Sequence, residues 1–202
     1  MGRKRSFDER QVLESAMHAF RRHGYAGLSI KRLEEETGLT SGSIYNAYGD
    51  KDGLFGAALA HYVDGFVGQR IAAHAGPAAT LDDLEELFLT LFRAPMTDGY
   101  GCLVTNSAVE FGSAGASAPA AVGRALDMVA AGVRDVLSRE IGPERAAIEA
   151  DRLLLLYHGI LVLSRAGRLD AGFEDAVRWQ FDMLRRLRDG LPPDFATRQE
   201  ED

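Results

Sequence analysis

The sequence has a single cysteine, Cys102, and no apolar run long enough to cross a lipid bilayer. One cysteine excludes a disulfide bond within the chain and fits a reducing compartment. The longest apolar stretch, 153–163, is interrupted by His158 and Gly159, whereas a membrane helix needs about 18 to 20 apolar residues. The basic start MGRKR has no apolar segment behind it, unlike a secretory signal. We therefore expect a cytoplasmic protein without a membrane span.

Patterns that carry catalysis or bind metals are also missing. The five histidines form no His-x-x-x-His or Glu-x-x-His pair, the spacings typical of metal-binding helices. No Gly-x-Ser-x-Gly or phosphate-loop pattern occurs among the 22 glycines. We expect no catalytic residue, no metal site and no cofactor, and hence no enzyme.

The excess of acidic residues is unevenly distributed. Up to Lys51 there are nine Lys and Arg against seven Asp and Glu, a net charge of +2; the remainder has 14 against 23, a net charge of −9. A basic N-terminal part suits contact with a polyanion, although so small a difference is also ordinary surface variation. The basic residues Arg3, Lys4 and Arg5 are either an arm that reaches DNA or a solvated end.

Apolar residues recur at three- and four-residue spacing through most of the chain, and alternation typical of strands is nearly absent. With capping residues and glycine or proline stops, this periodicity predicts an all-α fold of about nine helices. Thr80 and Asp83 form a predicted capping box, and Pro143 fits a first helical turn. The expected helices span residues 8–23, 29–37, 40–48, 50–73, 80–94, 102–111, 119–141, 143–166 and 173–188.

The second and third of these helices have the spacing of a helix-turn-helix. Gly38 stands at the turn, where a positive φ is expected. Five residues should point inward and hold the two helices together: Leu33, Thr37, Leu39, Ile44 and Ala47. The outward residues of the 40–48 helix are all hydrogen-bonding types that suit contact with a DNA groove: Thr40, Ser41, Ser43, Tyr45 and Asn46. Lys51, in the first turn of the next helix, can meet a phosphate.

The segment GYAGLSIKRLEEETGLTSGSIYNAYGDKDGLFGAAL, together with the preceding helix, resembles the DNA-binding domain of the TetR/AcrR transcriptional regulators over about residues 8–60. Matching elements are Gly24-Tyr25, Ser29-Ile30, Gly38-Leu39-Thr40, Gly42, Tyr45, Tyr48, Lys51 and Leu54. The sequence departs from the family pattern at four positions: Glu34 replaces a usual alanine, Ser41 a frequent lysine, Ala47 a tyrosine or histidine, and Tyr48 a phenylalanine. The candidate DNA-binding residues are Ser29, Lys31, Thr40, Ser41, Gly42, Ser43, Tyr45, Asn46, Tyr48 and Lys51.

The resemblance implies a DNA-binding domain over 1–50 and a C-terminal ligand-binding and dimerisation domain over 51–202, with the helix at 51–73 as connector. It implies a homodimer that pairs through the helices near 143–166 and 173–188 and binds a palindromic double-stranded DNA operator. A small-molecule effector, whose identity the sequence does not give, would shift the connector helix and release the DNA. Aromatic and sulfur-containing residues of the second domain are the candidate ligand contacts, against the alternative of plain core packing: Tyr62, Phe66, Phe88, Phe92, Met96, Tyr100, Cys102, Phe111 and Trp179.

Two functions from different classes remain open at this point. The first is a ligand-responsive transcriptional regulator that acts as a repressor. The alternative is an all-α small-molecule-binding or interaction protein with a degenerate DNA-binding head, which the residues at 34, 41 and 47 would suit. Cys102 is likewise either a thiolate activated at a helix start or a small buried apolar residue.

Overall fold

The structure is a computed structural model, and it describes residues 7–112 and 120–192. Within these ranges it is all-helical, without a strand, as expected. Residues 3–5 and 119 lie outside the described ranges, so the predicted basic arm and the predicted start at Pro119 lie outside them too. The elements are α1 (Glu9–His23), α2 (Ile30–Thr37), α3 (Ser41–Tyr48), α4 (Lys51–Tyr62), the π-helical segment η1 (Val63–Val67), α5 (Gly68–His74), α6 (Leu81–Leu89), the 3-10 turn η2 (Thr90–Phe92), α7 (Leu103–Phe111), α8 (Ala120–Ile141), α9 (Pro143–Arg165) and α10 (Ala171–Arg188).

The helix starts follow from the capping residues in the sequence. Thr80 and Asp83 form the predicted capping box at the start of α6, and Pro143 occupies the first turn of α9. Two predicted boundaries were wrong. The helix α10 begins at Ala171, two residues early, because the Asp170 carboxylate caps it by accepting from the Gly172 N–H at 2.9 Å. The helix α6 ends at Leu89 and tightens into η2, well before Pro95.

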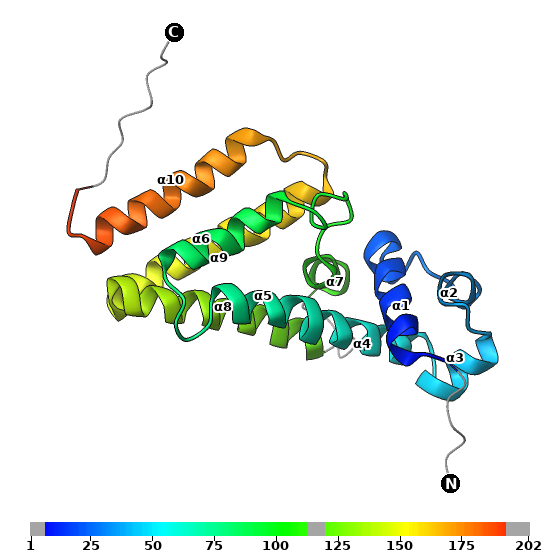
Figure 1. The fold of residues 1–202 in the computed structure, drawn as a ribbon. Coiled ribbons are helices and arrows are strands. Elements are labelled where there is room, and N and C mark those ends of the chain that lie inside the picture. The colour runs from blue at the N-terminus through cyan, green and yellow to red at the C-terminus, as the bar shows by residue number, and fades with distance from the viewer. Residues whose placement is uncertain (1–6, 113–119, 193–202) are drawn as a thin grey trace.

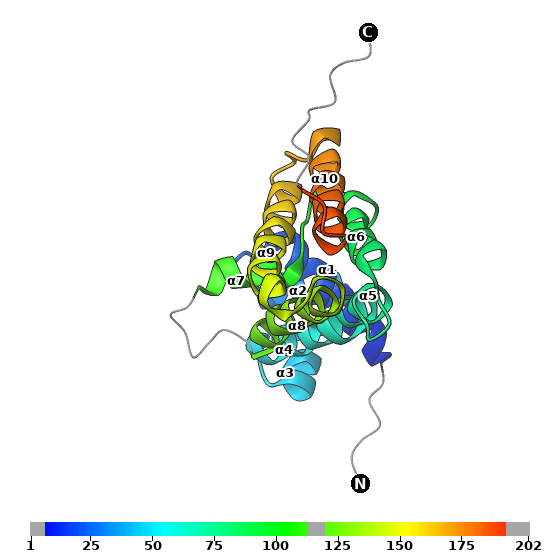
Figure 2. The same ribbon diagram turned by 90° about the vertical axis from the view of Figure 1, so that its left-hand side faces the viewer.

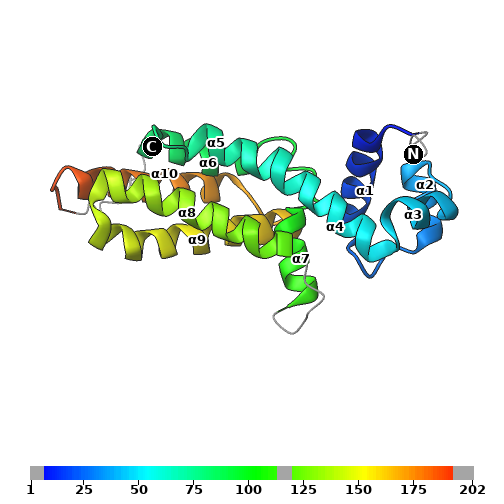
Figure 3. The ribbon, with the colours of Figure 1, turned by 90° about the horizontal axis from the view of Figure 1, so that it is seen from below.

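One long helix joins the two ends of the molecule. Since α4, η1 and α5 follow each other without a break, residues 51–74 run continuously from the group formed by α1, α2 and α3 along the remaining helices (Figures 1 and 3). We call α1–α3 with the first turns of α4 the head, and the rest the body. The head has its own apolar centre, formed by the fully buried side chains of Ala16, Phe20, Leu33, Ile44 and Leu54.

The body is organised around α8. This helix packs against α4, η1, α5, α6, α7, α9 and α10, and lies in the middle of the group when the molecule is viewed end-on (Figure 2). At Gly132 it lies close to the end of α5, since an added Cβ there would be 3.1 Å from the Cβ of Ala75. On the opposite side of the core, Phe88 of α6 packs edge-on against Tyr157 of α9 and Phe181 of α10.

A buried arginine joins the head to the body. The Arg21 side chain of α1 is 5% exposed and makes a two-pronged ion pair with Asp98, with nitrogen–oxygen distances of 2.7 and 2.8 Å. Its Nε also donates to the Gly101 carbonyl at 2.5 Å, and Nη2 donates to the Pro95 carbonyl at 3.2 Å. The loop before α7 is therefore fixed against the C-terminal end of α1.

The backbone of the same residue is held from α9. Arg165, at the C-terminal end of α9, donates from Nη1 to the carbonyls of Arg21 at 3.0 Å and Tyr100 at 2.7 Å. Asn106 of α7 donates to the Tyr100 carbonyl at 2.9 Å. Three segments far apart in the sequence thus meet at the end of α1.

Removing the Asp98 carboxylate should destabilise the protein strongly. In Asp98→Ala the Arg21 guanidinium stays buried without its counter-charge, and breaking such a pair costs about 3–5 kcal/mol. Because Asp98 is itself 34% exposed, we expect the lower end of this range, a loss of about 3 kcal/mol in the free energy of unfolding, measured by urea titration. Asp82→Ala, which removes an 81% exposed partner of Arg185, is the control and should cost less than about 1 kcal/mol. Equal losses in the two variants would contradict this assignment.

Candidate nucleic-acid interface

The turn between α2 and α3 has the predicted geometry. Gly38 has φ +71°, in the left-handed region, and its N–H donates to the Glu34 carbonyl at 2.9 Å. Leu33 and Ile44, one on each helix, are fully buried, and Leu39 between them is 8% exposed. The other two residues expected to point inward, Thr37 and Ala47, are only half-buried. The inward face of the helix-turn-helix was therefore predicted correctly at its three large apolar positions.

Side-chain hydrogen bonds fix the two helix starts. The Ser29 hydroxyl caps α2 by accepting from the Arg32 N–H at 3.2 Å, and the Thr40 hydroxyl caps α3 by accepting from the Ser43 N–H at 3.2 Å. Thr37 fills the turn: its hydroxyl donates to the Leu33 carbonyl at 2.6 Å and accepts from the Leu39 N–H at 3.3 Å. Ser29 and Thr40 thus accept from N–H groups at helix starts that have no partner within the helix, as capping residues do.

Glu34 fits the helix-turn-helix by bridging its two helices. Its carboxylate accepts a hydrogen bond from the N–H of Ser41, the first residue of α3. An acid near a helix N-terminus also interacts favourably with the helix dipole. The residue that departs most from the family pattern thus stabilises the orientation of α3 instead of disturbing it.

The predicted DNA-binding residues gather on and beside α3, at the end of the molecule remote from α10 (Figures 1 and 3). The exposed ones are Ser29, Lys31, Thr40, Gly42, Tyr45 and Asn46. Ser41, Ser43, Tyr48 and Lys51 are half-buried, and Tyr48 packs against the apolar core. Tyr45 is the most prominent large side chain of α3, with 53% of its surface exposed.

Lys51, in the first turn of α4, is held in place by an aromatic ring. Its ammonium nitrogen lies 4.1 Å from the centre of the Tyr25 ring, a cation–π contact. The Tyr25 hydroxyl donates to the Asp52 carboxylate, and this bond is the main reason that the pKa of Tyr25 is raised to about 12. The phenol therefore stays protonated at neutral pH, and the lysine lies beside α3 as the spacing predicted.

The candidate ligand contacts do not form one group. Tyr62 stacks on Phe66 at 5.2 Å between ring centres, and the Tyr62 hydroxyl donates to Cys102 Sγ at 3.5 Å. The others lie elsewhere: Phe88 in the core pair with Phe181, Phe111 against the head aromatics Tyr25 and Phe55, Tyr100 at the surface under Arg22, and Trp179 45% exposed on α10. Met96 is buried, and Phe92 is half-buried against the core.

A narrow cavity of about 10 Å³, the size of one water molecule, lies between η1, α7, α8 and α9. Its polar lining comes from Cys102, Thr105, Tyr157 and His158, and the rest is apolar. Burial raises the pKa of Tyr157 to about 12 and lowers the pKa of His158, so both are neutral at pH 7. Of the predicted contacts only Cys102 lines this space; it is buried, and it precedes the first residue of α7.

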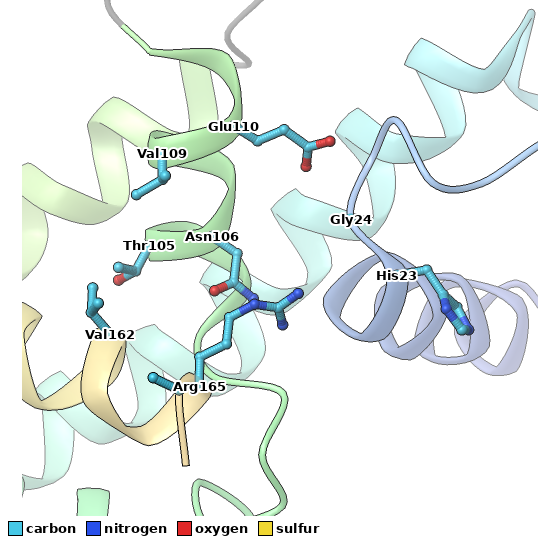
Figure 4. A pocket seen from close by; sticks show the side chains of 9 residues that line it. His23, Gly24, Thr105, Asn106, Val109, Glu110, Val162 and Arg165 are labelled. Carbon is cyan, nitrogen blue, oxygen red and sulfur yellow. The ribbon is translucent and has the colours of Figure 1, made fainter. Parts of the chain in front are cut away.

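Several residues that link head and body had no signal in the sequence. Arg21, Asp98, Asn106, Glu110 and Arg165 are ordinary surface-type residues in their local patterns. Their hydrogen-bond partners lie between 65 and 144 residues away along the sequence, except for Tyr100, which is six residues from Asn106. An open pocket of about 490 Å³ lies where α7 and α9 meet the end of α1, and it is lined by several of them (Figure 4).

Comparison with known proteins agrees with this geometry. Residues 12–58, which run from α1 into α4, match the family described as bacterial regulatory proteins, tetR family. The part of the chain that carries the helix-turn-helix is thus similar to the TetR family. Over 113 residues it is 32% identical to the "Uncharacterized HTH-type transcriptional regulator YezE" of Bacillus subtilis, and the match covers 54% of this chain and 58% of that protein. It is 43% identical over 54 residues to the HTH-type transcriptional repressor AcnR of Corynebacterium glutamicum, or 27% of this chain and 29% of AcnR.

These matches cover just over half of YezE and less than a third of AcnR, whereas the structural likeness extends over the whole TetR fold. A TetR family regulator from Cytophaga hutchinsonii superposes with a TM-score of 0.73 at 22% identity, over 96% of this chain and all of that one. A cysteine mutant of the TetR family regulator CifR, solved with 26 base pairs of operator DNA, has a TM-score of 0.73 at 25% identity, over 90% of this chain and 98% of CifR. The fold is that of a TetR regulator, with a helix-turn-helix end and a larger helical part.

Replacing the glycine of the TetR turn should cost stability even though there is room for a side chain. At Gly38 an added Cβ would contact nothing within 4 Å, so the penalty of Gly38→Ala comes from φ alone and should be about 1–2 kcal/mol. Gly42→Ala, inside α3 and also without close contacts, should be neutral or stabilise by up to about 1 kcal/mol. Thermal unfolding of the two variants measures the difference; a neutral Gly38→Ala would contradict the left-handed turn.

Proposed function

We propose that the protein is a ligand-responsive transcriptional repressor that binds a palindromic DNA operator as a homodimer. The observation that carries the proposal is α3, whose start is capped and whose exposed residues are hydrogen-bonding types that suit the edges of bases. The curated relative AcnR is described as a transcriptional repressor, and CifR was solved on its operator. DNA binding implies action where the chromosome is, in the cytoplasm.

The proposed division of labour follows the architecture. Residues 1–50 form the DNA-binding domain, and residues 51–202 form the effector-binding and dimerisation domain. Within the interface, Thr40, Tyr45 and Asn46 of α3 approach bases, while Ser29, Lys31 and Lys51 meet phosphates. Ser41, Gly42, Ser43 and Tyr48 support that surface. The N–H groups in the first turn of α3 that no side chain caps, together with Lys31 and Lys51, supply the electrostatic part of the binding.

The proposed dimer surface is an apolar stripe on α9. Ile148, Leu155 and Val162 are spaced seven residues apart and are 63%, 77% and 50% exposed. Gly159 lies on the same face and lets a second helix come close. Exposed apolar side chains in a row on a helix are typical of helix pairing. A second copy of this chain, paired through α9 and α10, would cover them and set the distance between the two heads.

The proposed effector is a small, uncharged molecule. The narrow cavity beside η1 is lined by apolar side chains and by neutral hydrogen-bonding groups, of which Tyr157 and His158 titrate outside the range that would charge them at pH 7. Charged ligands would pay for desolvation there without a counter-charge. An effector must widen this cavity of about 10 Å³ to enter it, and it would release DNA if the widened state sets the heads at a spacing that no longer fits the operator.

The first test is selection of bound duplexes from fragmented DNA of the source genome, followed by affinity against salt for the best fragment. The proposal expects a palindrome whose half-sites lie one helical turn or more apart, with affinity falling steeply as salt rises. Weak binding without any enriched sequence would refute it. That result would favour the alternative of a helical binding protein with a head that no longer reads DNA.

Truncating Tyr45 should weaken operator binding without unfolding the head. The side chain is half exposed, so Tyr45→Ala removes little buried surface, whereas loss of a contact in each half-site should lower affinity by about tenfold or more. Gel-shift titration with the selected operator measures this loss. Tyr100→Ala, at an exposed tyrosine in the loop before α7, is the matched control and should bind normally. Equal binding by wild type and Tyr45→Ala would remove Tyr45 from the interface.

A charge on the α9 stripe should separate the dimer. Leu155→Glu is tolerated by the single chain because the side chain is 77% exposed, but it places a carboxylate in the proposed helix contact. Sedimentation velocity should shift from dimer to monomer, and operator affinity should fall by about a hundredfold because the two heads are no longer linked. Gln69→Glu adds the same charge on an exposed position of α5 and should stay dimeric. A dimeric Leu155→Glu would move the interface elsewhere.

A further inference from the structure

A carboxylate of the body holds the backbone of the head. Glu110, near the C-terminal end of α7, accepts from the N–H of Tyr25 at 2.8 Å with Oε2 and from the N–H of Ala26 at 2.7 Å with Oε1. Figure 4 shows Glu110 pointing from α7 toward the loop at Gly24. Both N–H groups belong to the turn between α1 and α2, which has no other link to α7 through its backbone among the described contacts.

The turn is shaped for this carboxylate. Gly24 has φ +74°, a conformation that side chains rarely adopt, and an added Cβ there would lie 3.1 Å from Glu110 Oε2. Hydrogen bonds from two consecutive N–H groups to one ionised carboxylate are charge-assisted, and they fix direction as well as distance. The position of the turn therefore depends on the position of α7.

The turn that Glu110 holds also positions Lys51. The Tyr25 ring lies under the Lys51 ammonium at 4.1 Å, and the same ring contacts Phe111, the neighbour of Glu110, at 5.1 Å between ring centres. Asp52, next to Lys51, accepts from the Tyr25 hydroxyl. Tyr25 thus connects the end of α7 to the start of α4, beside the direct stacking of Phe111 on Phe55 of α4.

The other end of α7 lies in the body. Cys102, Val104 and Thr105 line the narrow cavity, while Gly101 accepts from the buried Arg21. The helix has only nine residues, so it links the cavity to Glu110 over a short distance. A shift at the cavity therefore reaches Glu110 without passing along α4.

We propose that Glu110 is a positioning residue for DNA binding: by holding the Tyr25–Ala26 backbone it keeps Lys51 where the lysine meets a phosphate. The inference rests on the proposed function and extends it, since it moves one determinant of DNA affinity into the body, 85 residues from its partner in the head. It also gives the cavity a direct route to a phosphate contact. Glu110 itself is exposed to solvent, so replacing it disturbs no core packing.

The test is a double-mutant cycle on the full chain with the operator selected above. The variants are Glu110→Ala, Lys51→Ala and the two combined; Glu110→Gln, which keeps one acceptor oxygen, is a graded variant. Glu86→Ala removes the same charge from an exposed pair with Arg93 and is the control. Affinity is measured against salt, and hydrogen exchange at residues 25 and 26 reports the held turn directly.

We expect Glu110→Ala and Lys51→Ala to weaken binding by about five- to twentyfold, each with a salt dependence less steep by about one unit per half-site. The combined variant should be no weaker than the weaker single one, because both changes remove the same contact. Exchange at residues 25 and 26 should accelerate in Glu110→Ala, less so in Glu110→Gln, and not in Glu86→Ala. A merely structural role would lower stability without changing the salt dependence.

The outcomes separate the two proposals. An unchanged salt dependence in Glu110→Ala, or losses that add in the combined variant, would overturn the positioning role and leave the repressor proposal intact. A wild type that enriches no operator would refute the repressor proposal, and this inference would fall with it.

Discussion

The arrangement of head and body depends on one buried charge, the guanidinium of Arg21. Four hydrogen bonds join it to the Asp98 carboxylate and to two backbone carbonyls of the loop before α7, and the planar fork of the arginine fixes the direction of each. Because the charge is removed from water, it tolerates little movement of the loop: each bond lost leaves a desolvated donor. The loop, α7 behind it and the end of α9 are therefore held in one relation to α1.

Around this fixed point the helix α7 has contacts of two kinds. Its start lines the body cavity with Cys102 and Thr105, and its end presents Glu110 and Phe111 to the turn after α1. The long helix α4–η1–α5 also connects the two parts, but it does so by continuity of the backbone. These connections, together with the Arg21 junction, make the orientation of the head sensitive to small changes in the body, since a packed junction moves between discrete arrangements.

The departures from the family pattern fit the surrounding contacts. Glu34 uses its extra length to accept from the first N–H of α3, which an alanine cannot do. In the proposed DNA interface the positive charge then comes mainly from Lys31 and Lys51, and Lys51 is held by Tyr25. In this proposal the head has fewer cations to attract DNA non-specifically, but Lys51 is held in a fixed position.

Local sequence determined the helices and the helix-turn-helix. Caps such as Ser29, Thr40 and Thr80, the glycine at 38 and the spacing of Leu33 and Ile44 act within a few residues, and these short-range rules predicted both the fold class and the geometry of the helix-turn-helix. Boundaries missed by a few residues, at α6 and α10, are also local effects. The tertiary structure alone decided where the candidate ligand residues lie and how the head is attached. Tyr100 and Phe111 have the same apolar character in sequence as Phe88, yet only packing sends them to the surface and the head. Arg21 and Asp98, or Glu110 and Tyr25, are joined across about 80 residues, and no local pattern encodes a contact whose two halves are chosen by the whole fold.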